Sequence, residues 1–302
     1  MASSEEYGGL ETVTVKHKGG SATITLHGAH IVSWIPDTAE SNLLYLSPTA
    51  VYSRTTAIRG GVPVCFPQFA GQGPLPNHGF ARKALWKVVS STPDSVTLLL
   101  DPSCDGVDGE AHPDFEVRYT VSLEGTGGER LVMDRQIKNT APDATFEQVL
   151  AAFPTPADLV FTDALHTYFA VPDVATTSVG GLQGCVYLDK TEGHALKTWE
   201  DELVTFPGEV DVGFRRAPLV TPIYTSQAQV EANTPTFEVV RSPSFRDLVV
   251  WNPGEELTSN MPDLESHKTF ICVEAANLEP VVVHPQDVSS AQCHLLFHPP
   301  TA

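Results

Sequence analysis

The chain has 302 residues and a formal net charge of −19 at pH 7, from 37 acidic side chains against 18 lysines and arginines. An acidic surface repels nucleic acid and anionic membrane faces, so we expect neither as a partner. No apolar run approaches the roughly 18 residues of a membrane-spanning helix. Because large β-sandwiches and barrels reach about 200 to 250 residues as one unit, we expect one domain over residues 1–302.

The five cysteines, at positions 65, 104, 185, 272 and 293, are odd in number and widely separated, and none forms a CxxC pair. This spacing is typical of reduced thiols rather than of a disulfide framework. The opening residues, MASSEEYGGL, have neither the basic nor the apolar segment of a secretory signal. We therefore expect a cytoplasmic protein, and we expect it to be a monomer.

Apolar and polar residues alternate along much of the chain, which is the pattern of half-buried antiparallel strands. A tight turn at Gly19-Gly20 is predicted to join the first two strands. No segment longer than about ten residues has the spacing of an amphipathic helix. The fold class is therefore all-β, a large antiparallel sandwich. In chain order, the predicted strands are Thr12–Lys18, Ser21–Leu26, Leu85–Ser91, Ser95–Leu100, Phe115–Leu123, Arg130–Lys138, Thr145–Ala152, Thr236–Arg241, Asp247–Trp251, Thr269–Glu274 and Ala291–Phe297.

One segment rich in Gly and Pro, RGGVPVCFPQFAGQGPLPNHGFAR (residues 59–82), begins with Arg59 and ends with Arg82. Guanidinium groups bind phosphate or carboxylate oxygens bidentately, so two of them framing one loop predict an anion site on an otherwise acidic protein. Gly60, Gly61 and Gly79 permit a positive φ or a close approach of the backbone to a ligand. The alternative, in which each arginine pairs with an acidic side chain, stays open at this point.

Two further side chains are candidates for proton transfer. His166, in DALHTYF, is a single imidazole in an aromatic and apolar strand, and an imidazole with its ordinary pKa of about 6.5 can act as a general acid. Glu274, in FICVEAANL, ends an apolar strand, where burial raises the pKa of a carboxyl and makes it a usable base. The alternatives are a hydrogen-bonded core histidine and a glutamate that turns to solvent.

The sequence gives little support for a metal or a cofactor. The segment DPSCDGVDGE (residues 101–110) lacks the ligand spacing of a calcium-binding loop and is predicted to be an acidic turn. Cys293, His294 and His298 have no CxxC or HExxH partner, so we do not predict zinc there. Because no P-loop, GxGxxG or GxSxG motif is present, we expect no metal and no nucleotide cofactor.

Six segments occur in an order that resembles one known family. They are RGGVPVCFPQF, LPNHGFAR, DALHTYF, GLQGCVYLDK, VVWNPG and ICVEAANL, between about residues 50 and 280. They are similar to segments of the hexose-6-phosphate mutarotases, also called glucose-6-phosphate 1-epimerases, of the aldose 1-epimerase superfamily. The resemblance implies a galactose mutarotase-like β-supersandwich. It also implies an isomerase that interconverts the α and β anomers of a hexose 6-phosphate, most simply glucose 6-phosphate, without a metal or cofactor.

The resemblance also implies roles for individual residues. Glu274 matches the family's general base and His166 its general acid. His78 is expected to line the same pocket. Four positions match substrate-binding residues, with the two arginines assigned to the phosphate: Arg59, Asn77, Arg82 and Asp189.

Two departures from the family's pattern put the sugar preference in doubt. Asn77 stands where the family often has Gln, which shortens the reach of the amide by one methylene. EVDVGF (residues 209–214) stands where related sequences commonly have Thr-Asp-Arg, so Asp211 is kept but the arginine after it is not; Arg215 and Arg216 are candidates to compensate. Two alternatives remain, an aldose 1-epimerase for unphosphorylated sugars and a non-catalytic sugar-phosphate-binding protein.

Overall fold

The computed structural model of the protein describes residues 3–143, 145, 154–155, 157–193 and 195–299. Its strands form three antiparallel sheets. The N-terminal four-stranded sheet has the order β1 (Ser3–Tyr7), β2 (Leu10–His17), β3 (Gly20–Thr25) and β4 (His30–Ile35). The eight-stranded sheet has the order β14 (Ala195–Thr198), β13 (Val186–Asp189), β16 (Val210–Phe214), β19 (Asp247–Asn252), β20 (Phe270–Val283), β10 (Leu159–Leu165) and β5 (Val64–Cys65), and β11 (Tyr168–Ala170) also pairs with β20.

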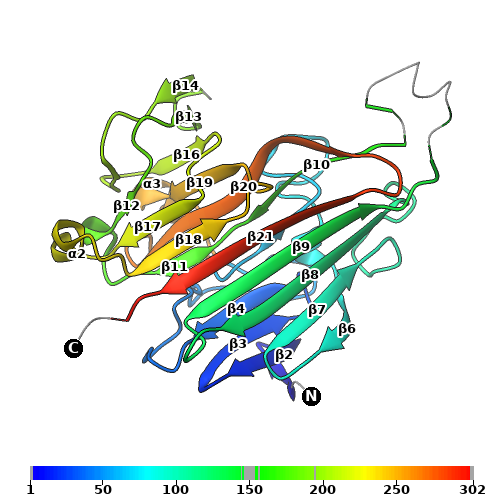
Figure 1. Cartoon of the computed structure of the whole chain (residues 1–302), viewed down its shortest axis with the longest axis horizontal. Coiled ribbons are helices and arrows are strands. Elements are labelled where there is room, and N and C mark those ends of the chain that lie inside the picture. Colours follow the sequence, from blue (N-terminus) through cyan, green and yellow to red (C-terminus); the bar gives the residue numbers. More distant parts are fainter. Residues whose placement is uncertain (1–2, 144, 146–153, 156, 194, 300–302) are drawn as a thin grey trace.

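The nine-stranded sheet crosses the front of the molecule in Figure 1, where β21, β9 and β8 are its longest strands. The four-stranded sheet packs on it through β2 and β3, which contact β8, and the eight-stranded sheet packs on it through β20, which contacts β18 and β21. The predicted all-β antiparallel sandwich is therefore confirmed. The order of this sheet is β15 (Leu203–Val204), β12 (Ser178–Gly180), β17 (Val220–Tyr224), β18 (Phe237–Arg241), β21 (Val288–Phe297), β9 (Arg130–Asn139), β8 (Phe115–Glu124), β7 (Ser95–Leu100) and β6 (Lys87–Ser91).

Helices are few and short in the described part of the chain. They are the α-helices α2 (Gln227–Ala232) and α3 (Gly254–Ser259) and the single 3₁₀ turns η1 (Ala81–Lys83) and η2 (Val174–Thr176). None of these described helices has the length and apolarity needed to cross a lipid bilayer.

The predicted strands agree best with the structure where the alternation is longest. Residues Ser95–Leu100 form β7 with the predicted bounds, and β8 and β9 each extend only one residue beyond theirs. The turn predicted at Gly19-Gly20 is shifted by one residue: His17 pairs with Gly20, so Lys18 and Gly19 form the turn, with φ values of 45° and 93°. The predicted strand Thr145–Ala152 lies almost entirely outside the described residues.

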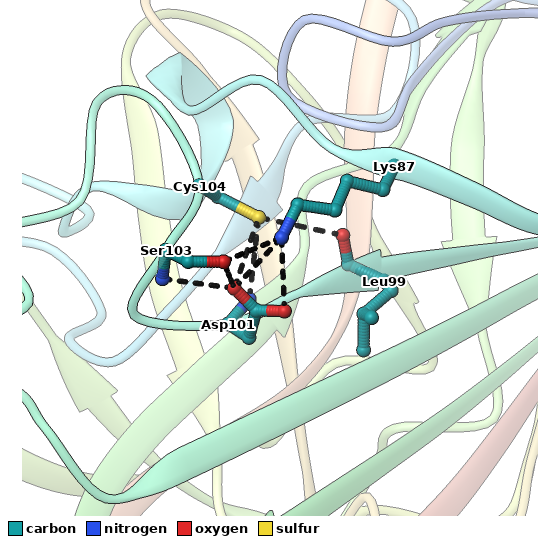
Figure 2. Close-up of polar contacts among 5 residues, drawn as sticks. All are labelled: Lys87, Leu99, Asp101, Ser103 and Cys104. Carbon is teal, nitrogen blue, oxygen red and sulfur yellow. Dashed lines mark hydrogen bonds and ion pairs between the residues drawn. The ribbon is translucent and has the colours of Figure 1, made fainter.

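The acidic segment after β7 is a turn in which an aspartate contacts a lysine side chain from β6 (Figure 2). The backbone N–H of Ser103 donates to Asp101 Oδ1 over 2.8 Å. Lys87 Nζ, from β6, lies 3.1 Å from both carboxylate oxygens of Asp101 and 2.5 Å from Ser103 Oγ. The Asp101 carboxylate therefore ties β6 to the end of β7, as expected for an acidic turn rather than for a calcium loop.

All five cysteines are free thiols, and four of them are buried: Cys65, Cys104, Cys272 and Cys293. Cys293 lies in the main hydrophobic core, and the nearby His298 contacts Glu238 Oε2 at 2.8 Å. These two residues are therefore used in packing and in a surface contact.

Candidate functional site

A cavity of about 450 Å³ lies on the face of the eight-stranded sheet that points away from the nine-stranded sheet. Strand alternation explains its position, because neighbouring residues point to opposite faces. Val250 and Val273 pack in the main core, whereas Trp251 and Glu274, the next residues along β19 and β20, line the cavity. The lining also includes Arg59, Pro63, Phe69, Asn77, His78, Arg82, Lys83, His166, Tyr168, Lys190, Asp211, Val249, Met261 and Asp263.

The Gly- and Pro-rich loop forms one side of this cavity, and its glycines are required by packing within the protein. Gly61 has a φ of 61°, and a Cβ on it would lie 2.3 Å from the carbonyl oxygen of Ile31 in β4. Gly79 has a φ of 68°, and its Cβ would lie 2.3 Å from the carbonyl oxygen of Phe66. These glycines therefore let the loop pack on backbone next to the cavity, and the close approach is to protein atoms rather than to a ligand.

His166 lies in the two-residue gap between β10 and β11, not within a continuous strand as the sequence pattern predicted. The N–H of His166 donates to the carbonyl of Pro63 over 3.0 Å, which extends the pairing of β10 with β5 toward the loop that carries Arg59. The imidazole stacks on the Tyr168 ring at 4.8 Å and 9°, and it meets the Trp251 ring edge-on. Aromatic packing thus fixes the orientation of the ring.

Glu274 lies in the middle of β20, which continues to Val283, so the prediction that it ends a strand was wrong. Its side chain is only 1% exposed, and its Oε1 lies 3.4 Å from Nδ1 of His166, whose side chain is 10% exposed. Neither Glu274 Oε2 nor His166 Nδ1 has a hydrogen-bond partner in the described part of the chain. The structure therefore brings the two predicted catalytic residues together as an isolated, buried pair.

Burial shifts the pKa values of this pair in opposite directions. It raises the pKa of Glu274 well above its usual 4.5; Lys190 opposes this shift, and Asp211 adds to it. Burial lowers the pKa of His166 well below 6.5, and the positive charges of Arg59, Arg82 and Lys190 act the same way, as would His78 if it were protonated. Although the 3.4 Å separation is within ion-pair distance, both shifts favour the neutral forms, so the pair is an acid–base couple rather than a stable salt bridge.

The two arginines of the loop differ in whether an acidic side chain neutralises their charge. Arg59 donates through Nε and Nη2 to the carboxylate of Asp263, each over 3.2 Å, and through Nη1 to the hydroxyl of Tyr168. Arg82 donates only to the carbonyl oxygen of Asn77, over 2.7 Å, and its Nε has no hydrogen-bond partner among the described residues. Because no ion pair is found for Arg82 within the described residues, it is the guanidinium better able to bind an anion.

His78 lines the cavity in a neutral form. Burial lowers its pKa to about 3, and the charges of Arg82, Lys190 and Arg59 act in the same direction. The N–H of Ala70 donates to its Nδ1 over 3.2 Å, so the proton of the neutral ring is on Nε2. His78 is therefore a hydrogen-bond donor at neutral pH and a poor candidate for an acid.

Asp189 is the one predicted binding residue that the structure does not bring to the cavity. Its Oδ1 accepts hydrogen bonds from the N–H groups of Thr191 and Glu192, and its Oδ2 lies 3.0 Å from Lys197 Nζ. It closes the turn after β13, and the cavity is lined instead by the next residue, Lys190.

Asp211 lines the cavity, and it is the residue of EVDVGF that matches the aspartate of the family's pattern. Its Oδ1 lies 2.5 Å from Lys190 Nζ. Arg215 and Arg216 do not take the position of the missing family arginine, because neither lines the cavity and Arg215 pairs with Glu279. Lys83 and Lys190 are cavity cations that the sequence did not predict as site residues. The only signal for Lys190 was its position directly after Asp189, and Lys83 directly follows Arg82.

One group of described residues has the geometry to contact a metal ion. His166, Cys272 and Glu274 each offer one ligand atom, all within 4.8 Å of one another. Cys272 does not line the cavity, and the other two atoms belong to the acid–base couple. An ion there would occupy the space between the groups that exchange protons, so the arrangement suits proton transfer better than a metal centre.

Comparison with known proteins places this geometry in a family. Residues 11–295 match the sequence model of the family described as Aldose 1-epimerase. A Cenchrus ciliaris protein named "Putative glucose-6-phosphate 1-epimerase" is 33% identical over 290 residues, covering 92% of this chain and 82% of that protein. An Escherichia coli protein of the same name is 32% identical over 271 residues, covering 88% and 83%.

A solved structure supports the assignment. The crystal structure of a "putative mutarotase" from Salmonella typhimurium superimposes with a TM-score of 0.78 at 27% sequence identity, covering 98% of this chain and 94% of that one. The chain belongs to the aldose 1-epimerase family.

Proposed function

We propose that this protein is an isomerase that interconverts the α and β anomers of a hexose 6-phosphate, glucose 6-phosphate first among them. One observation carries the proposal: a buried acid–base couple, His166 and Glu274, shares a cavity with Arg82, a guanidinium without an acidic partner among the described residues. The names of the relatives point to the same substrate. The chemistry requires two proton transfers and no electron transfer, so the proposal includes no metal and no cofactor.

The mechanism follows from the roles available to the couple. In the reactive form, the single proton of the couple lies on His166 and Glu274 is a carboxylate. Glu274 then takes the proton from the C1 hydroxyl while His166 gives its proton to the ring oxygen, and the pyranose opens to an aldehyde. Rotation about the C1–C2 bond presents the other face of the carbonyl. The ring then closes with the proton roles reversed, which yields the other anomer and restores the couple. Each positioned group contributes about 10²- to 10⁴-fold to such a reaction.

The direct test is the equilibration of anomerically pure α-glucose 6-phosphate, followed by polarimetry in a buffer that is a poor catalyst. The protein should accelerate the approach to equilibrium in proportion to its concentration. Unchanged equilibration would refute the proposal, and binding without acceleration would establish a non-catalytic sugar-phosphate-binding protein instead. Equal activity on glucose and glucose 6-phosphate would favour the alternative function, an aldose 1-epimerase for unphosphorylated sugars.

We propose that Arg82 is the main phosphate contact, supported by Lys83 and by Nη1 of Arg59, which does not contact Asp263 and donates to the hydroxyl of Tyr168. Arg82→Met should raise KM for glucose 6-phosphate about 10- to 100-fold with a small change in kcat, since charge-assisted hydrogen bonds contribute about 1.5 to 3 kcal/mol. Activity on glucose should hardly change. Arg215→Met is the matched control, because Arg215 pairs with Glu279 outside the cavity. A KM unaffected by Arg82→Met would remove Arg82 from the phosphate site.

The same couple predicts a bell-shaped dependence of kcat on pH. The active form carries one proton on the pair, so activity should be lost on the acid side when a second proton binds and on the alkaline side when the shared proton leaves. Because burial lowers the pKa of His166 and raises that of Glu274, the acid limb should lie below pH 6.5 and the alkaline limb well above the usual carboxyl pKa of 4.5. A rate that falls steeply as the pH is lowered from 8 to about 6.5, the ordinary pKa of an exposed histidine, would contradict this assignment.

The substrate-binding roles of Asn77 and His78 are supported by their position in the cavity wall. We also propose a cytoplasmic monomer without nucleic-acid or membrane partners. The five free thiols and the formal charge of −19 support this proposal. Light scattering at micromolar concentration would test the monomer, and a mass of twice 32.6 kDa would overturn it.

A further inference from the structure

Lys190 is a cation whose position the chain fixes from several sides. It directly follows β13, and its N–H donates to the carbonyl of Asp211, which extends the ladder between β13 and β16. Its ammonium lies 2.5 Å from Asp211 Oδ1 and 5.0 Å from the centre of the Phe69 ring. The side chain is only 11% exposed, and it lines the same cavity as Glu274.

The strands between Lys190 and Glu274 place both on one face of the sheet. Asp211 lies opposite Trp251 in the β16–β19 pair, and Trp251 lies opposite Cys272 in the β19–β20 pair. Residues opposite one another in antiparallel strands point to the same face, as do residues two apart on one strand. Glu274 therefore shares the face of Asp211, and the Lys190 ammonium sits across that face from a carboxyl with one orphaned oxygen, Oε2.

We propose that Lys190 is a positioning residue of the anomerisation reaction, whose ammonium holds Asp211 in the cavity wall and favours the ionised form of the Glu274 carboxyl that accepts the C1 hydroxyl proton. The inference rests on the proposed function. A buried carboxylate without hydrogen-bond donors is costly to ionise, and a nearby positive charge offsets part of that cost. Among the charges that act on Glu274, Lys190 is the main one that favours ionisation.

Besides Lys190, other titratable groups also face Glu274. Asp211 disfavours the negative charge of Glu274, and Arg59 and Arg82 act mainly on His166. The cavity also contains His78 and Asp263, the latter paired with Arg59. Near Glu274 lie His166, the phenol of Tyr168 from β11, and two buried thiols from β20 and β5: Cys272 and Cys65. Burial raises the pKa of each thiol and of the phenol, so these three groups stay neutral across the pH range of the test.

The test is the pH profile of kcat for glucose 6-phosphate in Lys190→Met, with Lys190→Arg as the rescue and Lys197→Met as the matched control. Lys197 also pairs with an aspartate of the same hairpin, but it lies outside the cavity. Lys190→Met should lower the plateau of kcat about 10-fold and move both limbs to higher pH, because a lost positive charge raises the pKa of an acid and of an imidazole alike. Lys190→Arg should restore both features, and Lys197→Met should leave them unchanged.

A second variant keeps the inference falsifiable if Lys190→Met does not fold. Asp211→Asn removes a negative charge beside Glu274, so its limbs should move to lower pH, opposite to those of Lys190→Met. Limbs that stay at wild-type pH in both variants would overturn the role of Lys190, as would a loss of kcat that arginine does not rescue. Failure of the proposed function itself is seen separately, because the wild-type protein would then not accelerate anomerisation at any pH.

Discussion

Glu274→Gln is expected to lower kcat for glucose 6-phosphate anomerisation by about 10²- to 10⁴-fold and to change KM by less than about 3-fold. Glutamine keeps the shape of the side chain but cannot accept the proton from the C1 hydroxyl. Polarimetry from the pure α anomer gives both constants. Glu279→Gln is the matched control, since Glu279 lies on the same strand but is exposed and pairs with Arg215. If Glu274→Gln retained wild-type kcat, another group would have to be the base.

The stability of the same variant, relative to that of the wild-type protein, should increase as the pH rises above about 4.5. Burial raises the pKa of Glu274 in the folded protein, so the folded state binds more protons than the unfolded state once the pH exceeds the unfolded value of about 4.5. Wild-type stability therefore falls from that pH until Glu274 ionises in the folded protein, whereas the glutamine variant has no such loss. Thermal unfolding at pH 5 and pH 8 measures it; an equal difference in Tm at the two pH values would show that Glu274 ionises freely.

The second large effect is expected at a buried ion pair behind the catalytic strands. Arg135 of β9 and Asp163 of β10 are 2% and 5% exposed, and Arg135 Nη2 lies 2.7 Å from Asp163 Oδ2. The guanidinium packs between the rings of Phe161 and Phe245, and the Asp163 carboxylate accepts a hydrogen bond from Asn277 of β20. The pair thus joins the two sheets close to the catalytic residues. Asp163 is three residues from His166, and its partner Asn277 is three residues from Glu274.

Asp163→Ala should lower the free energy of unfolding by about 3 to 5 kcal/mol, because it leaves the Arg135 charge buried and unpaired. Urea denaturation measures the loss. The double variant Arg135→Met with Asp163→Ala removes both charges and should recover much of it, since desolvation of a lone ion is the main cost. Asp134→Ala, on the exposed side of β9, is the control. A single variant as stable as the wild type would mean that water reaches Arg135.

Sequence predicted the parts of the fold in which alternation is long. Strands β7, β8 and β9 have one face in the core and one toward solvent, so the period of two is visible in their residues. The short strands β13 to β17 carry two to five residues each, which is too few for a period to be recognised. Their pairing depends on tertiary contacts that a local pattern does not contain.

The candidate site was predicted by residue type and family resemblance more than by local pattern. Glu274 interrupts an apolar run, so a strand continuing to Val283 was predicted to stop there. The reason is physical: β20 is buried on both faces, and one of those faces lines the cavity. His166 was expected within a strand because no local sequence signal marks the two-residue gap between β10 and β11.

Charge partners were the least predictable feature of the site. Asp189 and Lys190 are adjacent in sequence, and the end of β13 between them decides which side chain enters the cavity. Likewise, the pairing of Arg59 with Asp263 joins residues that are far apart in the chain. A sequence pattern identifies such charges, but only the folded backbone determines which of them are neutralised.

The pairing of β10 with β20 has a consequence for how the protein becomes active. These neighbouring strands position His166 and Glu274, yet more than 100 residues separate them, so the couple cannot form until the chain as far as β20 is available. Contacts between distant segments form slowly, because a long loop must close first. Recovery of anomerase activity during refolding should therefore lag behind the signal from the local hairpin β8–β9, and activity becomes a sensitive reporter of the last long-range step.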